Sequence, residues 1–166
     1  MPNGRLWERA QSVPLEVAEN ILPGFNISFD TKVPKEMQHE LRSFVRYMES
    51  HYRIPITLWV DFEYRHYLVN RDGKRVGYQF YWADFVSYPV FKNLDDIPMI
   101  RLPVRTEHST LESILFSFLQ AITDYYAWLC GVKPEDVNDL DEKDAEAVLE
   151  TYLNACDAGE WHFIGC

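Results

Sequence analysis

Apolar residues change their spacing twice along the sequence, and each spacing predicts a different element. Between residues 34 and 51 they recur three or four positions apart, which predicts a helix whose first turn holds Pro34. Between residues 55 and 64 they occupy every second position, which predicts a strand with one buried face. From Leu111 to Leu129 the helical spacing returns and continues for about five turns.

Turn and cap signals divide the rest of the sequence. Asp72-Gly73 lies between two β-rich runs and predicts a hairpin turn. The segment IPMIRLPV, residues 97–104, predicts a short strand, and its prolines favour a sheet edge or a strand end. Ser109 and Glu112 match a capping box at the start of the long helix.

A last helix is predicted after Gly131 and Pro134 have ended the long one. It begins near Asp139, with Glu142 three residues on as its partner in the first turn, and runs towards Gly159.

The order of these elements predicts an α+β domain. It has an N-terminal helix, a three- to four-stranded antiparallel or mixed sheet with a β-hairpin, and two C-terminal helices. A chain of 166 residues with 47% hydrophobic residues fits a single domain, residues 1–166. Residues 1–33 are rich in turn formers, so we expect an irregular segment that wraps the core, with at most a short helix near residues 14–21. Residues 34–158 form the core and residues 159–166 a tail.

Charge and cysteine content narrow the class of partner and the compartment. The net charge is −10, and residues 107–166 hold half of the acidic residues but only two basic ones. Phosphate contacts need Lys and Arg, so we expect no nucleic-acid partner; an acidic face keeps a domain soluble or meets a basic partner. There is no run of about 20 apolar residues, so we expect no membrane partner.

Three cysteines, and a first segment without the apolar core of a secretory signal, predict a cytoplasmic protein.

The long helix has an unusual polar face. Gln120 and Asp124 lie opposite its apolar stripe, with small residues such as Ser117 around them and Trp128 at the border. No Lys, Arg or Glu occurs between Ser113 and Lys133. A solvated face usually carries such residues, so we expect this one to be covered or to line a cleft.

The phrase ILFSFLQAITDYYAWL, residues 114–129, resembles the active-site helix of the small zincin metallopeptidases, the SprT-like and minimal gluzincin forms. The resemblance covers about residues 35–155 and implies a zincin-like core. It implies that Gln120 and Asp124 replace the two zinc-binding histidines and that Ala121 replaces the catalytic glutamate. It also implies that residues 97–104 form an edge strand beside the cleft, and that Glu142 stands where the family has its third ligand.

These replacements argue against zinc chemistry. A catalytic zinc site of this type needs two imidazoles, a third ligand and a glutamate that takes a proton from the bound water. Gln120 offers an amide, Ala121 cannot move a proton, and no histidine occurs between His108 and His162. We therefore expect no catalytic residue, no zinc and no cofactor. Gln120, Asp124 and Glu142 could instead hold Ca²⁺ or Mg²⁺, or form a polar contact between two helices, which is the simpler interpretation.

The ring-rich segment YQFYWADF, residues 78–85, offers a second candidate surface. In a strand, Tyr81 and Gln79 would share one face, and if that face is open it would suit a protein or peptide partner. The sequence thus favours a non-catalytic binding or regulatory domain. A hydrolase using Asp124 with Glu142, or Glu107 with His108, remains an alternative, as does a small acidic inhibitor or immunity-type protein.

Overall fold

The fold is α+β, as the sequence predicts. The computed structural model describes residues 5–13, 24–81, 98–104 and 110–161. The helices are α1 (Leu6–Ala10), α2 (Lys35–His51), α3 (Leu111–Leu129) and α4 (Asp139–Asp157), with a 3-10 turn, Pro134–Asp136, before α4. The strands are β1 (Phe25–Phe29), β2 (Leu58–Glu63), β3 (Leu68–Val69), β4 (Arg75–Val76), β5 (Gln79–Tyr81) and β6 (Met99–Pro103).

Four strands form one mixed sheet in the order β1-β2-β6-β5. Strands β1, β2 and β6 are parallel, with Ile27 beside Val60 and Val60 beside Ile100, and β5 is antiparallel to β6. The prediction that residues 97–104 form a sheet edge is wrong, because β6 is paired on both sides. Its prolines permit this because Pro98 precedes the strand and Pro103 ends it, so the residues between them keep their N–H donors.

Two parts of the N-terminal third are more regular than the sequence interpretation allowed. Residues 25–29 form the edge strand β1, and residues 6–10 form the short helix α1. Trp7 fixes α1, since its Nε1 donates to Thr123 Oγ1 at 3.1 Å and its ring meets the Tyr126 ring edge-on at 4.9 Å. The short helix predicted near residues 14–21 lies outside the described residues.

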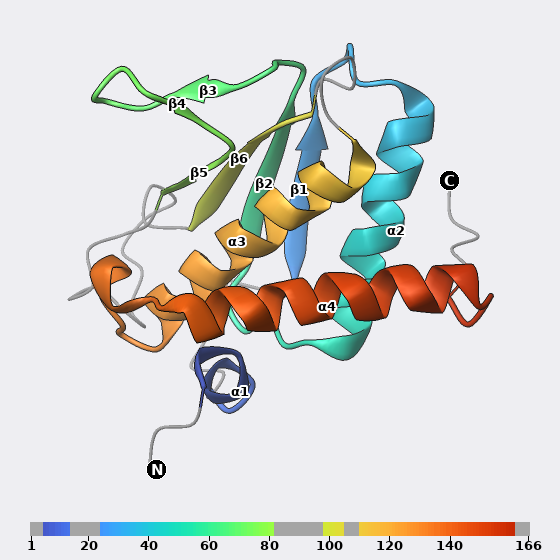
Figure 1. Ribbon diagram of the computed structural model, residues 1–166. Coiled ribbons are helices and arrows are strands. Elements are labelled where there is room, and N and C mark those ends of the chain that lie inside the picture. The colour runs from blue at the N-terminus through green and yellow to red at the C-terminus, as the bar shows by residue number, and fades with distance from the viewer. Residues whose placement is uncertain (1–4, 14–23, 82–97, 105–109, 162–166) are drawn as a thin grey trace.

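The predicted hairpin is confirmed. Strands β3 and β4 pair antiparallel, and Gly73 between them has a φ of 77°, which a residue with a side chain rarely adopts. Asn70 closes the turn by accepting hydrogen bonds from the backbone of Asp72 and Lys74, each at 3.0 Å. The hairpin forms a separate two-stranded sheet that projects from the domain (Figure 1).

The core lies between one face of the sheet and the helices α2 and α3 (Figure 1). Phe118 of α3 is at its centre, with the rings of Phe44 and Phe62 both 5.6 Å away. Helix α4 packs across α3, and Tyr152 ties it to α2 through a hydrogen bond from its hydroxyl to Ser43 Oγ at 3.2 Å. Within the described ranges no helix has the length and apolarity needed to cross a membrane.

Both C-terminal helices begin at a different cap from the predicted one. Thr110 caps α3 by accepting from the Ser113 amide at 3.1 Å, while Ser109 lies outside the described residues. Asn138 and Asp141 form the capping box of α4, so Glu142 is not a cap residue. The sequence is ambiguous here because both Asn138 to Asp141 and Asp139 to Glu142 have the spacing of a capping box.

Candidate functional site

The polar face of α3 lies against the segment that joins β4 to β5. The Tyr78 hydroxyl donates to Asp124 Oδ2 at 2.7 Å. About two turns earlier on α3, Ser117 faces Gly77, where a Cβ atom would come within 3.2 Å of Ser117 Oγ. Gln120 and Asp124 are both half-buried. This face is therefore packed against other parts of the protein at Ser117 and Asp124.

Burial shapes the titration of the groups at this contact. Burial raises the pKa of Asp124, and the hydrogen bond from Tyr78 opposes that rise. Burial also raises the pKa of the Tyr78 hydroxyl, and the charges of Asp124 and Glu142 add to the effect. The fold thus joins Tyr78 to Asp124, and the charge of Glu142, exposed on α4, acts on the same hydroxyl.

The two remaining positions of the predicted cleft are in the core. Trp128 is 1% exposed and Ala121 is 0% exposed, so neither lines an open surface. Trp128 packs beside Tyr125, with ring centroids 6.1 Å apart. Among the residues that the structure describes, no three His, Cys, Asp or Glu side chains are grouped closely enough to hold a metal ion.

The other face of the mixed sheet presents a different set of side chains. Alternation along the strands turns Trp59, Met99 and Tyr81 away from the core. These three stand in one row, because Met99 pairs with Trp59 on one side and with Tyr81 on the other. None of the described helices covers this row, and Trp59 is 37% and Tyr81 45% exposed. We call this side of the sheet the open face.

Arg101, in the row of the open face next to Met99, connects the side chains of three strands. The Arg101 guanidinium forms a bidentate ion pair with Glu63, through Nε and, at 2.7 Å, through Nη2. Its Nη1 donates to Gln79 Oε1 at 2.9 Å and to the Tyr81 hydroxyl at 3.3 Å, and Tyr81 in turn donates to Gln79 Oε1 at 2.5 Å. Hydrogen bonding to Glu63 raises the pKa of Arg101 further above its usual value. Arg101 thereby joins β2, β6 and β5 and holds the Tyr81 ring in place.

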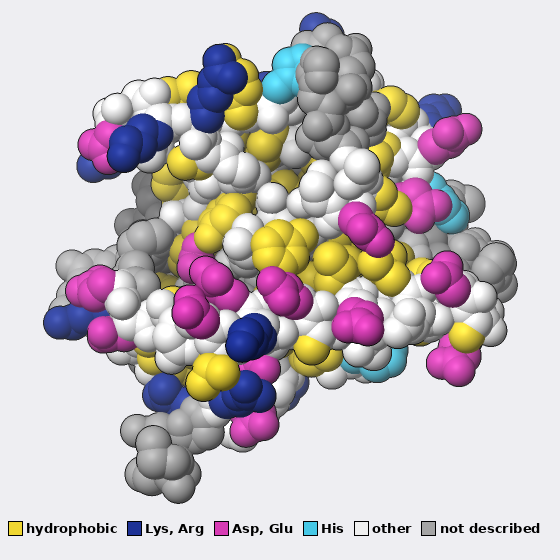
Figure 2. Space-filling model, viewed as in Figure 1, with side chains coloured by type: hydrophobic (Ala, Val, Ile, Leu, Met, Phe, Trp, Pro, Cys, Tyr) yellow, Lys and Arg dark blue, Asp and Glu magenta, His cyan; other side chains and the backbone are white. Residues whose placement is uncertain are grey.

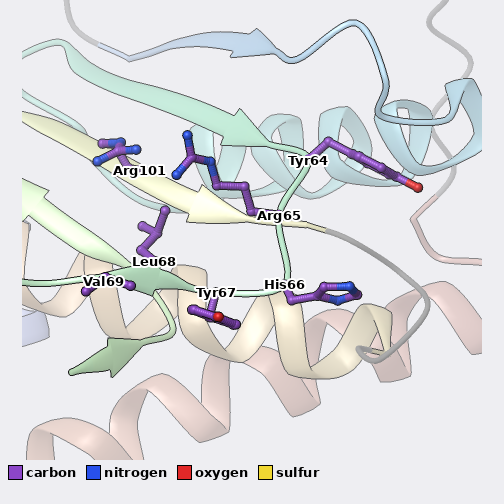
Figure 3. A pocket seen from close by; sticks show the side chains of 7 residues that line it. All are labelled: Tyr64, Arg65, His66, Tyr67, Leu68, Val69 and Arg101. Carbon is purple, nitrogen blue, oxygen red and sulfur yellow. The ribbon is translucent and has the colours of Figure 1, made fainter. Parts of the chain in front are cut away.

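A pocket of about 410 Å³ opens beside Arg101 (Figure 3). It is lined by Arg101 and by six consecutive residues that follow β2: Tyr64, Arg65, His66, Tyr67, Leu68 and Val69. Figure 3 shows Leu68 and Val69 on the hairpin strand β3 and Arg65 extending back over β6 towards Arg101. Arg65 Nε lies 3.3 Å from Glu63 Oε1, so Glu63 pairs with both arginines.

Comparison with protein-family models, with curated proteins and with solved structures finds no match.

On the face drawn in Figure 2, Lys and Arg side chains cluster on the hairpin and a row of Asp and Glu side chains follows α4, with further Lys and Arg side chains beside that row. The Arg75 guanidinium lies 4.1 Å from the centroid of the Tyr67 ring, a cation–π contact that turns a basic group towards the pocket wall. The acidic residues of the last third thus occupy a different element from the basic residues of the hairpin.

Sequence reasoning placed Gln79 and Tyr81 on one strand face, and the structure brings both to the open face. It missed Trp59, Glu63 and Arg101, which belong to the same surface. The sequence does contain an indication for Trp59. It occupies a solvent-facing position of the alternating strand, and a large exposed ring there indicates a surface that is covered or that binds a partner. The pairing of Glu63 with Arg101 depends on strand order and had no local signal.

Proposed function

We propose that the protein is a non-catalytic protein- or peptide-binding domain on a zincin-like scaffold, with the open face as its contact surface. The observation that carries the proposal is the row of Trp59, Met99 and Tyr81, two exposed rings on either side of a methionine. Aromatic residues, Met and Arg are the types enriched at protein interfaces. Energetically dominant contacts come most often from Trp, Tyr and Arg.

The packing of α3 supports a non-catalytic function. A zincin-like cleft needs an open position above its central helix, but Tyr78 binds Asp124 there and Ala121 is inside the core. The zincin-like part of the proposal draws on the position of α3 against a mixed sheet, and on the influence that both Asp124 and Glu142 have on the Tyr78 hydroxyl.

A hydrolase is the second candidate, and one observation favours it. Burial raises the pKa of Asp124, as is common for an acid or base in catalysis, and the charge of Glu142 acts on the Tyr78 hydroxyl that Asp124 binds. In that case Asp124→Asn would abolish the activity and leave the fold intact. The pocket beside Arg101 lies elsewhere and does not include either carboxylate.

Selection from a random peptide-display library, with the full 166-residue protein as bait, tests the proposal. We expect enriched peptides whose affinity falls at least tenfold in Trp59→Ser and in Tyr81→Ser. Leu140→Ser is the matched control, because Leu140 is an exposed apolar residue on α4, away from the sheet. Peptides that bind all three variants equally would place the contact elsewhere, and the absence of any enrichment would contradict the binding function.

A further inference from the structure

The pocket beside Arg101 has more cationic than anionic groups. Arg101 and Arg65 both pair with Glu63, and Arg75 stands over the Tyr67 ring in the pocket wall. An arginine side chain stays charged at any physiological pH, so two cations share this one carboxylate, and Arg75 adds a third positive charge outside the lining. The next acid on the open face, Asp61, is beside Arg101 in the strand register and accepts a hydrogen bond from Ser28 Oγ at 3.1 Å on its other side. It does not line the pocket, whose lining among the described residues contains two arginines and no acidic residue. The pocket therefore attracts an anion.

The two arginines of the pocket differ in what they can still bind. Arg101 donates hydrogen bonds to Glu63, Gln79 and Tyr81, and these contacts hold the strands of the open face together. Among the described residues, Arg65 is paired with Glu63 through Nε, and its side chain is 61% exposed. Its two terminal nitrogens are then available as a fork, a geometry that matches the two oxygens of a carboxylate.

We propose that this pocket binds a carboxylate of the partner, either an acidic side chain or the C-terminal carboxylate of its polypeptide. The proposal deepens the proposed function and rests on it. Met99 and Arg101 are two residues apart on β6, about 7 Å, so one partner seated on the exposed rings reaches the pocket. A volume of about 410 Å³ is in the range of small-ligand pockets and leaves room for an acidic side chain or a chain terminus.

The charge already present in the pocket favours a carboxylate over a phosphate. Glu63 lies between the two arginines, so any bound anion approaches its negative charge. A monoanion limits that repulsion, whereas a phosphate dianion doubles it. The apolar wall formed by Leu68 and Val69 also suits the methylene groups of an acidic side chain.

Nuclear magnetic resonance of the full 166-residue protein, observing the arginine Nε–Hε signals at constant ionic strength, tests this. The probes are a blocked Gly-Glu-Gly peptide, its Gly-Gln-Gly counterpart, a Gly-Gly-Gly peptide with a free C-terminal carboxylate, and inorganic phosphate. We expect saturable shifts of the Arg65 signal with one or both carboxylate peptides. The tighter of the two identifies the source as a side chain or a terminus. The Gln peptide and phosphate should bind at least tenfold more weakly.

Arg65→Gln should weaken carboxylate binding at least tenfold. Arg71→Gln is the matched control, since Arg71 is an exposed arginine in the turn of the nearby β3–β4 hairpin and does not line the pocket. Binding that survives in Arg65→Gln, equal binding of the Gln peptide, tighter binding of phosphate, or no saturable shift would each overturn the pocket proposal. Display-selected peptides that still require Trp59 and Tyr81 would then show that the open face binds without the pocket. Carboxylate binding by Arg65 without any selected peptide would instead contradict the function proposed for the open face.

Discussion

Replacing Asp124 by Asn should stabilise the protein at neutral pH. Burial raises the pKa of Asp124 more than the Tyr78 hydrogen bond lowers it, so ionising this carboxyl costs more in the folded than in the unfolded state. An asparagine at this position would be uncharged at every pH, and its amide oxygen could still accept from the Tyr78 hydroxyl, which lies 2.7 Å from the present carboxylate. The exchange concerns one polar contact, and we expect a gain of about 1 kcal/mol or less.

The size of this effect depends on pH. Because the folded pKa of Asp124 is above the unfolded one, its favourable contribution is fully present below the unfolded pKa of about 3.9 and is lost as pH rises through the folded pKa. The free energy of unfolding of Asp124→Asn, minus that of wild type, should thus be near zero at about pH 3, then rise and level off.

Urea denaturation of both proteins from about pH 3 to pH 8 measures that difference, in which the other titrating groups largely cancel. Asp72→Asn is a control in an exposed turn that both residue types favour, and its difference should stay within about 0.5 kcal/mol at every pH. A difference for Asp124→Asn that falls with pH would refute the reasoning. It would mean that the charge-assisted bond from Tyr78 outweighs the cost of burial.

Three further sets of substitutions test other contacts. Gly77→Ala should destabilise the fold by about 1–2 kcal/mol, because the new Cβ meets Ser117 Oγ at 3.2 Å. Adding Ser117→Ala should recover most of that loss, measured by denaturation. No recovery would show that the segment joining β4 to β5 does not pack on α3. Tyr125→Phe should lower the free energy of unfolding by about 2–4 kcal/mol, since the Tyr125 hydroxyl accepts from the buried N–H of Ile56 and donates to its C=O. A loss below about 0.5 kcal/mol in the same assay would contradict that contact. In a zinc titration, the double variant Gln120→His, Asp124→His should bind the metal, with Glu142 as the third ligand. Adding Glu142→Gln should weaken this binding. A folded double variant that binds no zinc would contradict the zincin resemblance.

The parts of the fold that were predicted correctly are those with a local signal. The strand around Val60 and the helix around Phe118 follow from a spacing of two and of about 3.6, and the hairpin from Asp72-Gly73. Strand β1 was missed although its sequence FNISF alternates, because the turn formers around it suggested an irregular segment. The interior position of β6 was missed because it depends on β5 pairing back against it, and no nearby residue encodes that.

The candidate site divides in the same way. The family resemblance put Asp124 and Glu142 in one site. The structure joins Asp124 to Tyr78, a contact that no spacing rule predicts, and the charge of Glu142 acts on that hydroxyl. The pocket could not be predicted, because its wall and its base belong to segments about 35 residues apart that meet only when β2 and β6 become neighbours.

The hydrogen bonds on the open face bear on how well it could bind. A tyrosine that must be ordered by its partner loses side-chain entropy on binding, about 0.5–1.5 kcal/mol for a mobile side chain. The Tyr81 hydroxyl is already held by Arg101 and Gln79, and Arg101 is held by Glu63. Much of that entropy is therefore lost on folding, before any partner arrives. If the open face binds a partner, a ring fixed in this way is the preorganised contact that such a surface requires.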